Sequence, residues 1–209
     1  MRTLLASAAN PGPARPTGPN ARAGNDALLL SGVAGGDKPA MQVLFSKYHV
    51  AVYRFVLRRL RNKAQAEDVT GEVFLDVWRH AAGFDGRTAV STWILAIARR
   101  KAFAARPQVL PSHSGGGTSG AGEIDEDLAG VPDAIPDTRN RNPALGRCLA
   151  GLSIEHREII DLVYCQEQSV AAVATILGIP AAAARTRLDD ARKLLLDGLR
   201  KSGAAPNRV

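Results

Sequence analysis

The sequence predicts an all-α protein made of two small helical bundles that a flexible linker joins. Alanine and leucine are abundant and aromatic residues make up only 5% of the 209 residues, which favours helix over sheet. Apolar residues recur at helical spacing in two blocks, 26–106 and 144–202. Residues 107–143 hold proline, glycine and acidic residues instead. We therefore expect a disordered tail over 1–25, a first domain, a linker, a second domain and a short tail over 203–209.

The formal net charge of +7 is unevenly distributed, with +6 in the first domain and −4 in the linker. A basic chain of this kind points to nucleic acid or an acidic partner. No apolar run approaches the roughly 18 residues of a membrane-spanning helix, so membrane insertion is not expected. Cys148 and Cys165 form no CxxC pair, which argues against a zinc ribbon or a disulfide scaffold.

Four helices are expected in the first domain. A short one covers 26–34, and Asp37 is a plausible N-cap for the next, whose apolar residues run from Met41 to Leu60. The third covers 64–82, where valine or alanine repeats every four residues. An acidic stripe with the same spacing accompanies it: Asp68, Glu72 and Asp76.

Two glycines in the segment 83–88 end the third helix, and the fourth helix covers 90–106. Trp93, Ile94 and Ile97 are its expected buried residues. Its last turns are basic, with Arg99, Arg100, Lys101 and Arg106. Basic residues beside an aromatic residue and a glycine-rich loop suit melted DNA, although core packing is the simpler interpretation of Trp93.

The second domain is predicted to contain a helix-turn-helix. A short helix covers 143–151, and Ser153 caps the helix after it. Ser169 caps a third helix that Gly178 ends, and a final helix follows over 181–199. The start of that final helix presents Arg185, Thr186 and Arg187, side chains that can contact base edges or phosphates. The alternative is an ordinary helical hairpin with solvated charges.

Taken together, the two blocks resemble the sigma factors of bacterial RNA polymerase, of the small extracytoplasmic-function (ECF) type. The segments that carry the resemblance are 36–102 and 149–195. Within the first, the ordered run AEDVTGEVF–VW, then FxGR, then TWIxAIAR is far more specific than a helix-turn-helix alone. The resemblance implies sigma region 2, a linker and sigma region 4, with no other domain.

The resemblance also implies a role for individual residues. The segment 67–78 would dock on the clamp coiled coil of the largest polymerase subunit, through Asp68, Glu72, Asp76 and Trp78. The next segment would open and bind the minus-10 element, through Phe84, Arg87, Ser91, Trp93, Arg99, Arg100 and Lys101. The final helix of the second domain corresponds to the family's recognition helix. It would bind the minus-35 element through Arg185, Thr186, Arg187 and Arg192.

At several positions the chain departs from the family pattern. Gly71 stands where glutamine is usual in the clamp-binding helix, and Arg100 stands where asparagine often holds a captured base. In the recognition helix, three alanines replace part of the familiar motif, and Asp189 and Asp190 occupy positions that are often aromatic or basic. Acidic groups that face phosphates repel them, so these two are expected to weaken minus-35 binding or change its preference.

The expected partners are core RNA polymerase, promoter DNA and an anti-sigma factor, and the expected location is the cytoplasm. An acidic linker patch, 123–127, could instead fold back on the basic end of the fourth helix. Exposed charge pairs contribute only about 0–1 kcal/mol each, which favours an external inhibitor.

Four scattered histidines and the absence of nucleotide-binding or nucleophile motifs predict no catalytic residue, no metal and no cofactor. Two other functions remain alternatives to the sigma factor. One is a stand-alone helix-turn-helix regulator, which would have no use for an acidic docking stripe. The other is an all-α adaptor without DNA binding, which the two aspartates of the recognition helix keep open.

Overall fold

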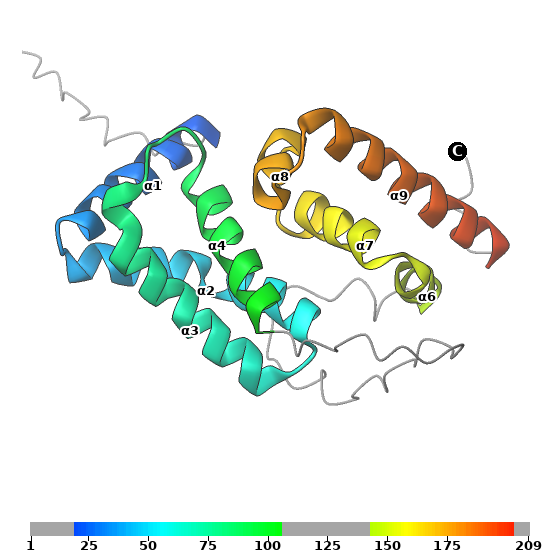
Figure 1. The fold of residues 1–209 in the computed structure, drawn as a ribbon, viewed down its shortest axis with the longest axis horizontal. Coiled ribbons are helices and arrows are strands. Elements are labelled where there is room, and N and C mark those ends of the chain that lie inside the picture. The colour runs from blue at the N-terminus through cyan, green and yellow to red at the C-terminus, as the bar shows by residue number, and fades with distance from the viewer. Residues whose placement is uncertain (1–18, 106–142, 203–209) are drawn as a thin grey trace, which may run out of the picture.

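The computed structural model describes residues 19–105 and 143–202, and all of their regular structure is helical. The first domain contains α1 (Pro19–Ala34), α2 (Lys38–Leu60), α3 (Lys63–His80), the 3-10 turn η1 (Ala81–Gly83) and α4 (Val90–Ala104). The second contains α6 (Pro143–Gly151), α7 (Ile154–Ile160), the π-helical turn η3 (Asp161–Cys165), α8 (Val170–Leu177) and α9 (Ala181–Lys201). Figure 1 shows them as two helical bundles, which confirms the expected fold class. The expected linker lies outside the described residues except for Pro143, as do most of the first tail and all of the last.

The helix ends follow the expected local signals. The side chain of Asp37 accepts a hydrogen bond from the Ala40 amide at 3.3 Å and caps α2. Ser153 and Ser169 cap α7 and α8 in the same way. Gly178 ends α8 with a φ of 67°, a left-handed conformation that glycine adopts without steric cost.

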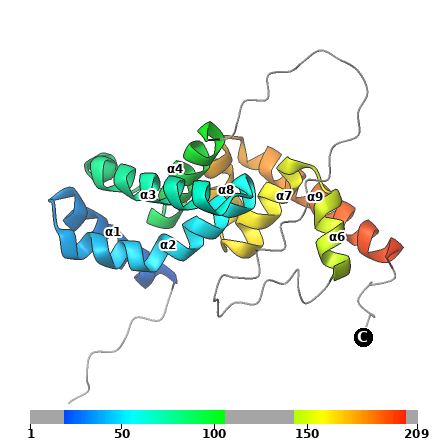
Figure 2. The same cartoon turned by 90° about the horizontal axis from the view of Figure 1, so that it is seen from below.

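In the first bundle, α1, α3 and α4 pack around the long helix α2 (Figure 2). The core contains fully buried side chains from each of these helices, among them Leu30, Phe55, Val73 and Ile94. α1 begins at Pro19, seven residues before the expected start at Asp26. A proline is well placed in the first turn, because it has no N–H to satisfy and its φ already suits a helix.

Buried Asp26 joins α1 to α2. The hydroxyl of Tyr48 donates a hydrogen bond to Asp26 Oδ2 at 2.5 Å, and Lys47 forms an ion pair with the same carboxylate. Burial of the phenol, together with this carboxylate, raises the pKa of Tyr48.

The second bundle packs α7 and α8 against the long helix α9. Val173, Ala174 and Leu188 are buried where α8 and α9 meet, and the small side chain of Ala174 allows their close approach. The sequence did not indicate the π-helical turn that continues α7. Its buried residues are Asp161 and Leu162. This turn brings the chain from α7 to the capping residue of α8.

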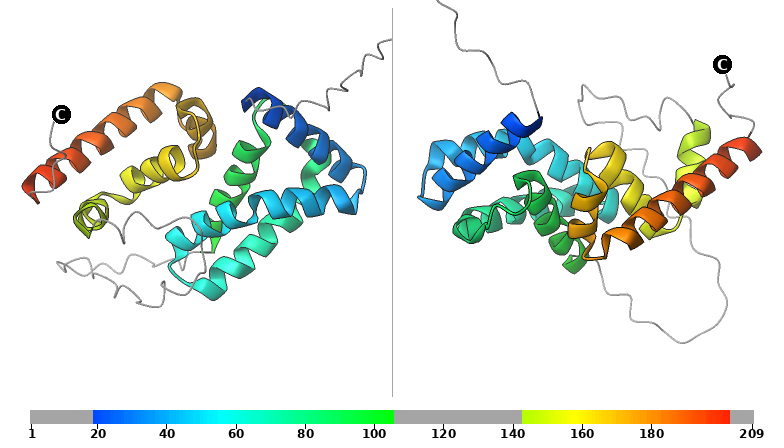
Figure 3. Two further views of the ribbon diagram at one scale, coloured as in Figure 1. Left: turned by 180° about the vertical axis from the view of Figure 1, so that it is seen from behind. Right: turned by 90° about the horizontal axis from the view of Figure 1, so that it is seen from above.

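The two bundles contact each other. α4 lies against α8, and the C-terminal part of α2 approaches α7 (Figures 1 and 3). The contact therefore combines the helix expected to bind the minus-10 element with the first helices of the helix-turn-helix domain.

Candidate nucleic-acid interface

The acidic stripe of α3 divides into an exposed part and a buried part. Asp68 and Glu72 are exposed, whereas Asp76 is buried against α4. The ammonium of Lys101 lies 3.1 Å from Asp76 Oδ2 and 3.2 Å from Glu72 Oε2. The hydrogen bond to Asp76 is the main cause of the raised pKa of Lys101. Asp76 and Lys101 were expected to contact different partners, and here they neutralise each other. Trp78 is half-buried against the core.

The loop before α4 presents one basic residue to solvent. Arg87 is exposed, with its backbone amide bonded to Asp85 and its Nε atom 3.4 Å from the same carboxylate. Phe84 and Trp93 are both half-buried and pack edge to face, with ring centroids 5.5 Å apart. Trp93 is thus held by packing, and part of its side chain remains accessible.

Along α4, the remaining minus-10 candidates point in different directions. Arg100 is exposed to solvent. Ser91 and Arg99 are half-buried on the side that faces the second bundle. Lys101 faces the acidic stripe. In this arrangement only part of the expected minus-10 surface is open.

Charged side chains gather where the bundles meet, and we call them the interdomain cluster: Arg58, Arg59, Arg99, Glu158 and Asp161. Glu158 Oε1 accepts hydrogen bonds from Arg59 at 2.6 Å and from Arg99 at 2.7 Å. Arg58 Nε lies 2.7 Å from Asp161 Oδ1. Arg59 also lies over the ring of Phe55, with its guanidinium carbon 3.6 Å from the ring centroid. Because both carboxylates come from the second domain and all three arginines from the first, the cluster joins the two domains.

The two carboxylates of the cluster respond differently to their surroundings. Burial raises the pKa of Glu158, but the charges of Arg59 and Arg99 outweigh burial and hold this pKa below its ordinary value. For Asp161, burial outweighs the attraction of Arg58 and Arg59 and raises the pKa. Burial also lowers the pKa of Arg59 against the opposing effect of Glu158. Glu158 is therefore the better compensated carboxylate.

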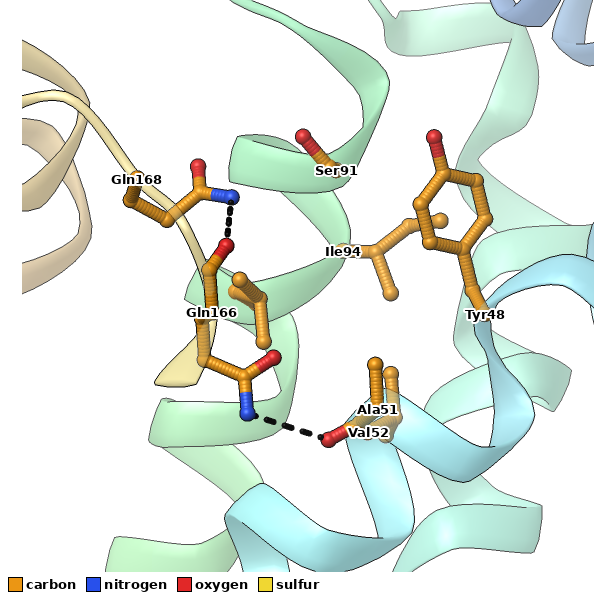
Figure 4. A pocket seen from close by; sticks show the side chains of 8 residues that line it. Tyr48, Ala51, Val52, Ser91, Ile94, Gln166 and Gln168 are labelled. Carbon is orange, nitrogen blue, oxygen red and sulfur yellow. Dashed lines mark hydrogen bonds between the residues drawn. The ribbon is translucent and has the colours of Figure 1, made fainter. Parts of the chain in front are cut away.

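Neutral hydrogen bonds extend the contact beside this cluster. The Thr92 hydroxyl donates to Gln168 Oε1 at 2.9 Å, and Gln166 Nε2 donates to the Ala51 carbonyl at 3.4 Å. Figure 4 shows the small cavity beside them, which Ser91 and Ile94 of α4 line together with Tyr48 of α2 and the two glutamines of the second domain. Apolar contact accompanies these hydrogen bonds, because α4 packs against α8 and the buried apolar side chains of the two domains form one continuous cluster.

The recognition helix α9 presents three of its four candidates, Arg185, Thr186 and Arg192, to solvent. Arg185 and Thr186 are exposed near its start. Arg187 Nη2 lies 3.1 Å from Glu155 Oε2 of α7, and Arg192 Nε donates to the Tyr164 hydroxyl at 2.8 Å. Both arginines are held by residues of the preceding turns, but only Arg187 is half-buried, so Arg185, Thr186 and Arg192 form the open part of the surface.

The two aspartates of α9 are paired within the helix. Asp189 lies 3.5 Å from Arg192, and Asp190 lies 3.8 Å from Lys193, each pair spaced by three residues. Such exposed pairs partly cancel the negative charge that the helix would present to a phosphate.

The sequence analysis missed the acceptors of the interdomain cluster. Glu158 and Asp161 stand three residues apart within an otherwise apolar stretch, Ile159–Ile160 and Leu162–Val163. Charged residues inside such a stretch are seldom buried without a partner, and this pattern could have indicated a contact with basic groups.

The described residues contain neither a membrane-spanning helix nor a cluster of metal-binding side chains. No helix there is long and apolar enough to cross a membrane. No three His, Cys, Asp or Glu side chains in the ranges 19–105 and 143–202 are grouped so that they could hold a metal ion.

The fold and its basic surfaces define a two-domain transcription factor with a helix-turn-helix, and comparisons with known proteins agree. Residues 44–106 match the family model for sigma-70 region 2, and residues 143–195 match the model for sigma-70 region 4. The ECF RNA polymerase sigma factor SigL of Mycobacterium tuberculosis is 31% identical over 181 residues, which cover 83% of this chain and 97% of SigL. SigK of Mycobacterium ulcerans is 30% identical over 190 residues, covering 88% of this chain and 96% of SigK.

Two solved structures share the fold. One is CnrH in complex with the cytosolic domain of CnrY, with a TM-score of 0.60 and 20% identity over 84% of this chain and 97% of CnrH. The other is RpoE of Bartonella quintana in complex with the anti-sigma factor NepR, with a TM-score of 0.52 and 17% identity over 76% of this chain and 96% of RpoE.

This chain belongs to the ECF RNA polymerase sigma factors of the sigma-70 family. Its function is that of a sigma factor, which directs RNA polymerase to promoters. The resemblance seen in the sequence is confirmed, and the stand-alone regulator is not favoured.

Proposed function

We propose that this sigma factor binds core RNA polymerase through the exposed part of the α3 stripe and contacts promoter DNA through two separate basic surfaces. The observation that carries the proposal is the placement of three charged surfaces on three helices. Asp68 and Glu72 are exposed on α3, Arg87 and Arg100 on the α4 side of the first domain, and Arg185 on α9. Each surface has the charge and exposure that its expected partner requires.

On α3, Asp68 and Glu72 supply the charge for docking on a basic partner, while Asp76 holds α3 to α4 through Lys101. Trp78, half-buried beside them, contributes packing. The exposed residues of the stripe therefore contact the polymerase, and its buried residue Asp76 fixes the position of α4.

On the DNA side, Arg87 and Arg100 bind phosphates of the minus-10 region, and Trp93 offers its accessible part to an unstacked base. Ser91 and Arg99 join this surface once the second domain moves away. On α9, Arg185 and Thr186 enter the major groove of the minus-35 element, while Arg187 and Arg192 support the helix from its sides.

An anti-sigma factor is the proposed inhibitor, since the structurally similar RpoE was solved in complex with the anti-sigma factor NepR. The sigma factor works in the cytoplasm, where the polymerase and the promoters are. It acts by binding and not by catalysis, as is usual for its family.

The test is run-off transcription with core polymerase and templates that carry candidate promoters. Addition of this protein should produce a transcript of defined length from one class of promoter. A stand-alone regulator would bind DNA but would not direct core polymerase to a specific start site. The absence of any specific transcript over a library of promoters from the same genome would contradict the proposal.

A further inference from the structure

The interdomain cluster lies on the surface that the minus-10 element is expected to use. Arg99 is one of the residues assigned to that element, and Glu158 of α7 holds its guanidinium at 2.7 Å. A guanidinium that forms a close ion pair with a carboxylate has fewer donors to offer a phosphate oxygen. Glu158 therefore occupies a position on Arg99 that DNA would need.

We propose that α7 acts as an internal latch, whose carboxylates Glu158 and Asp161 hold the chain closed and cover part of the minus-10 surface, Ser91 and Arg99, while the minus-35 surface stays exposed. The proposal rests on the proposed function, because it uses the assignment of Arg99 to the minus-10 surface. It adds a regulatory contact inside the chain, distinct from an anti-sigma factor and from the acidic patch of the linker.

The charge balance of the cluster suits a latch that DNA can displace. Three guanidinium groups face two carboxylates, so the arginine side keeps an excess positive charge when closed. Arg59 and Glu158 are largely buried, with side-chain exposures of 17% and 13%. Separation of the domains leaves three adjacent arginines that need new anionic partners, and the phosphates of a DNA strand supply them.

The neutral part of the contact covers the beginning of α4. Thr92 bonds to Gln168, and Ser91, Ile94 and Leu95 border the cavity that Gln166 and Gln168 close (Figure 4). Polar contacts of this kind exchange readily for water, as in domain interfaces that open and close. The closed form thus covers both the start of α4 and Arg99.

The recognition helix is not masked in the same way. Arg185 and Thr186 are exposed while the latch is closed, and the partners of Arg187 and Arg192 lie within the second domain. The closed chain should therefore bind duplex DNA through α9 but bind single-stranded DNA poorly. When the domains separate, single-strand binding should increase while duplex binding through α9 stays the same.

The test compares the full chain with the double variant E158Q/D161N, using small-angle scattering for domain separation and labelled DNA of mixed sequence for binding. The variant should have a larger radius of gyration. It should bind single-stranded DNA about 5- to 20-fold more tightly at low salt, because a larger fraction of molecules is open. Duplex binding should change less than about twofold. Adding R99A to the double variant should abolish most of the gain for single strands.

Two further variants keep the result interpretable. D197N removes one negative charge from an exposed pair on α9 and should leave both size and binding unchanged. Q166A/Q168A removes the neutral hydrogen bonds without leaving a buried charge unpaired, and should open the chain to a smaller extent even if the double variant fails to fold.

The latch is overturned if both sets of variants remain as compact as the parent, or if they open without a gain in single-strand binding. Duplex binding and promoter-dependent transcription by the parent chain are measured in parallel. Their absence would contradict the proposed function, whereas the scattering result tests the closure by itself.

Discussion

Lys101 of α4 and Asp76 of α3 form an ion pair at 3.1 Å that joins the expected DNA-binding helix to the expected polymerase-binding helix. Asp76 is buried, and its side chain is only 12% exposed. Its first task is therefore structural, and this distinguishes it from Asp68 on the same stripe.

D76N should lower the free energy of unfolding by about 1–3 kcal/mol, because it weakens a charged hydrogen bond in a largely buried site. D68N should change the free energy by no more than about 0.5 kcal/mol, since Asp68 is exposed. Urea unfolding of the full chain measures both. Equal stability of the two variants would show that the ion pair with Lys101 contributes little.

Charge reversal at the exposed part of the stripe should weaken the binding of core polymerase. D68K and E72K each place a positive charge where a basic partner surface is expected, and this juxtaposition is unfavourable. Affinity for core polymerase, measured by fluorescence anisotropy at moderate salt, should fall while the circular dichroism stays unchanged. K38E, at the start of α2, is the control for a change of charge elsewhere in the first domain. If D68K and E72K bind like the parent, the stripe is only a solvated helix face.

R185A should reduce the affinity for the minus-35 duplex by about 1–3 kcal/mol if the contact is bidentate to a base. If Arg185 contacts a phosphate instead, R185A should reduce the slope of the logarithm of the binding constant against the logarithm of the salt concentration by about one. R187A should weaken binding as well, and E155Q should tell how much of that effect arises from the ion pair with α7. R200A, at the far end of α9, is the control. Unchanged binding and promoter preference in R185A and R187A would remove α9 from the DNA surface.

Glu158 should make stability depend on pH in the acid range. Its pKa is lowered in the folded chain, so it contributes stability above its ordinary value of 4.5 and loses it as the pH falls through the folded-state pKa. Asp161 opposes this, because its raised pKa lets protonation relieve the cost of burial. We expect E158Q to be less stable than the parent by about 1–3 kcal/mol at pH 7, with a smaller difference at acid pH.

Thermal unfolding of the parent and E158Q between pH 7 and pH 3 measures this difference. E155Q, an exposed neighbour on α7, should show no comparable convergence. A difference that stays constant down to pH 3 would mean that the ionised carboxylate is not what stabilises the contact.

Gly71 lies in the interior of α3 with an exposed position, and a Cβ atom there would meet no heavy atom within 4 Å. G71A should therefore stabilise the first domain by about 0.5–1 kcal/mol. G86A, at a φ of 71°, should be destabilising instead and is the contrasting variant. G71Q carries the residue usual in the family and should also raise the affinity for core polymerase. Equal polymerase affinity of G71Q and G71A would argue against a contact at this position.

Local signals predicted the fold well because they act within a few residues. The caps at Asp37, Ser153 and Ser169 and the turn at Gly178 each depend on one side chain or one backbone angle. Phe45 lies within the apolar run from Met41 to Leu60 that predicts α2, yet it is 40% exposed and packs at the surface against His49 and the edge of Phe74. Helical periodicity gives the direction of a side chain, and the neighbouring helix decides its burial.

The site was predicted in part, for a similar reason. A spacing of four residues places Asp68, Glu72 and Asp76 on one stripe, but the packing of α4 buries only the last of them. The contact between the domains joins residues up to 115 positions apart, such as Gln166 and Ala51. Periodicity and motifs carry no information about such a contact.

A single oxygen atom of Glu158 serves two arginines that lie 40 positions apart in the chain, Arg59 and Arg99. Loss of the carboxylate would leave both guanidinium groups without this acceptor at once, whereas loss of either arginine would leave the acceptor in use. Substitution of the glutamate is therefore expected to cost more stability than substitution of either arginine. Either arginine can be replaced first at moderate cost, whereas the glutamate is the costliest of the three to replace first, so the order of substitutions in a lineage would record how the contact between the domains was lost.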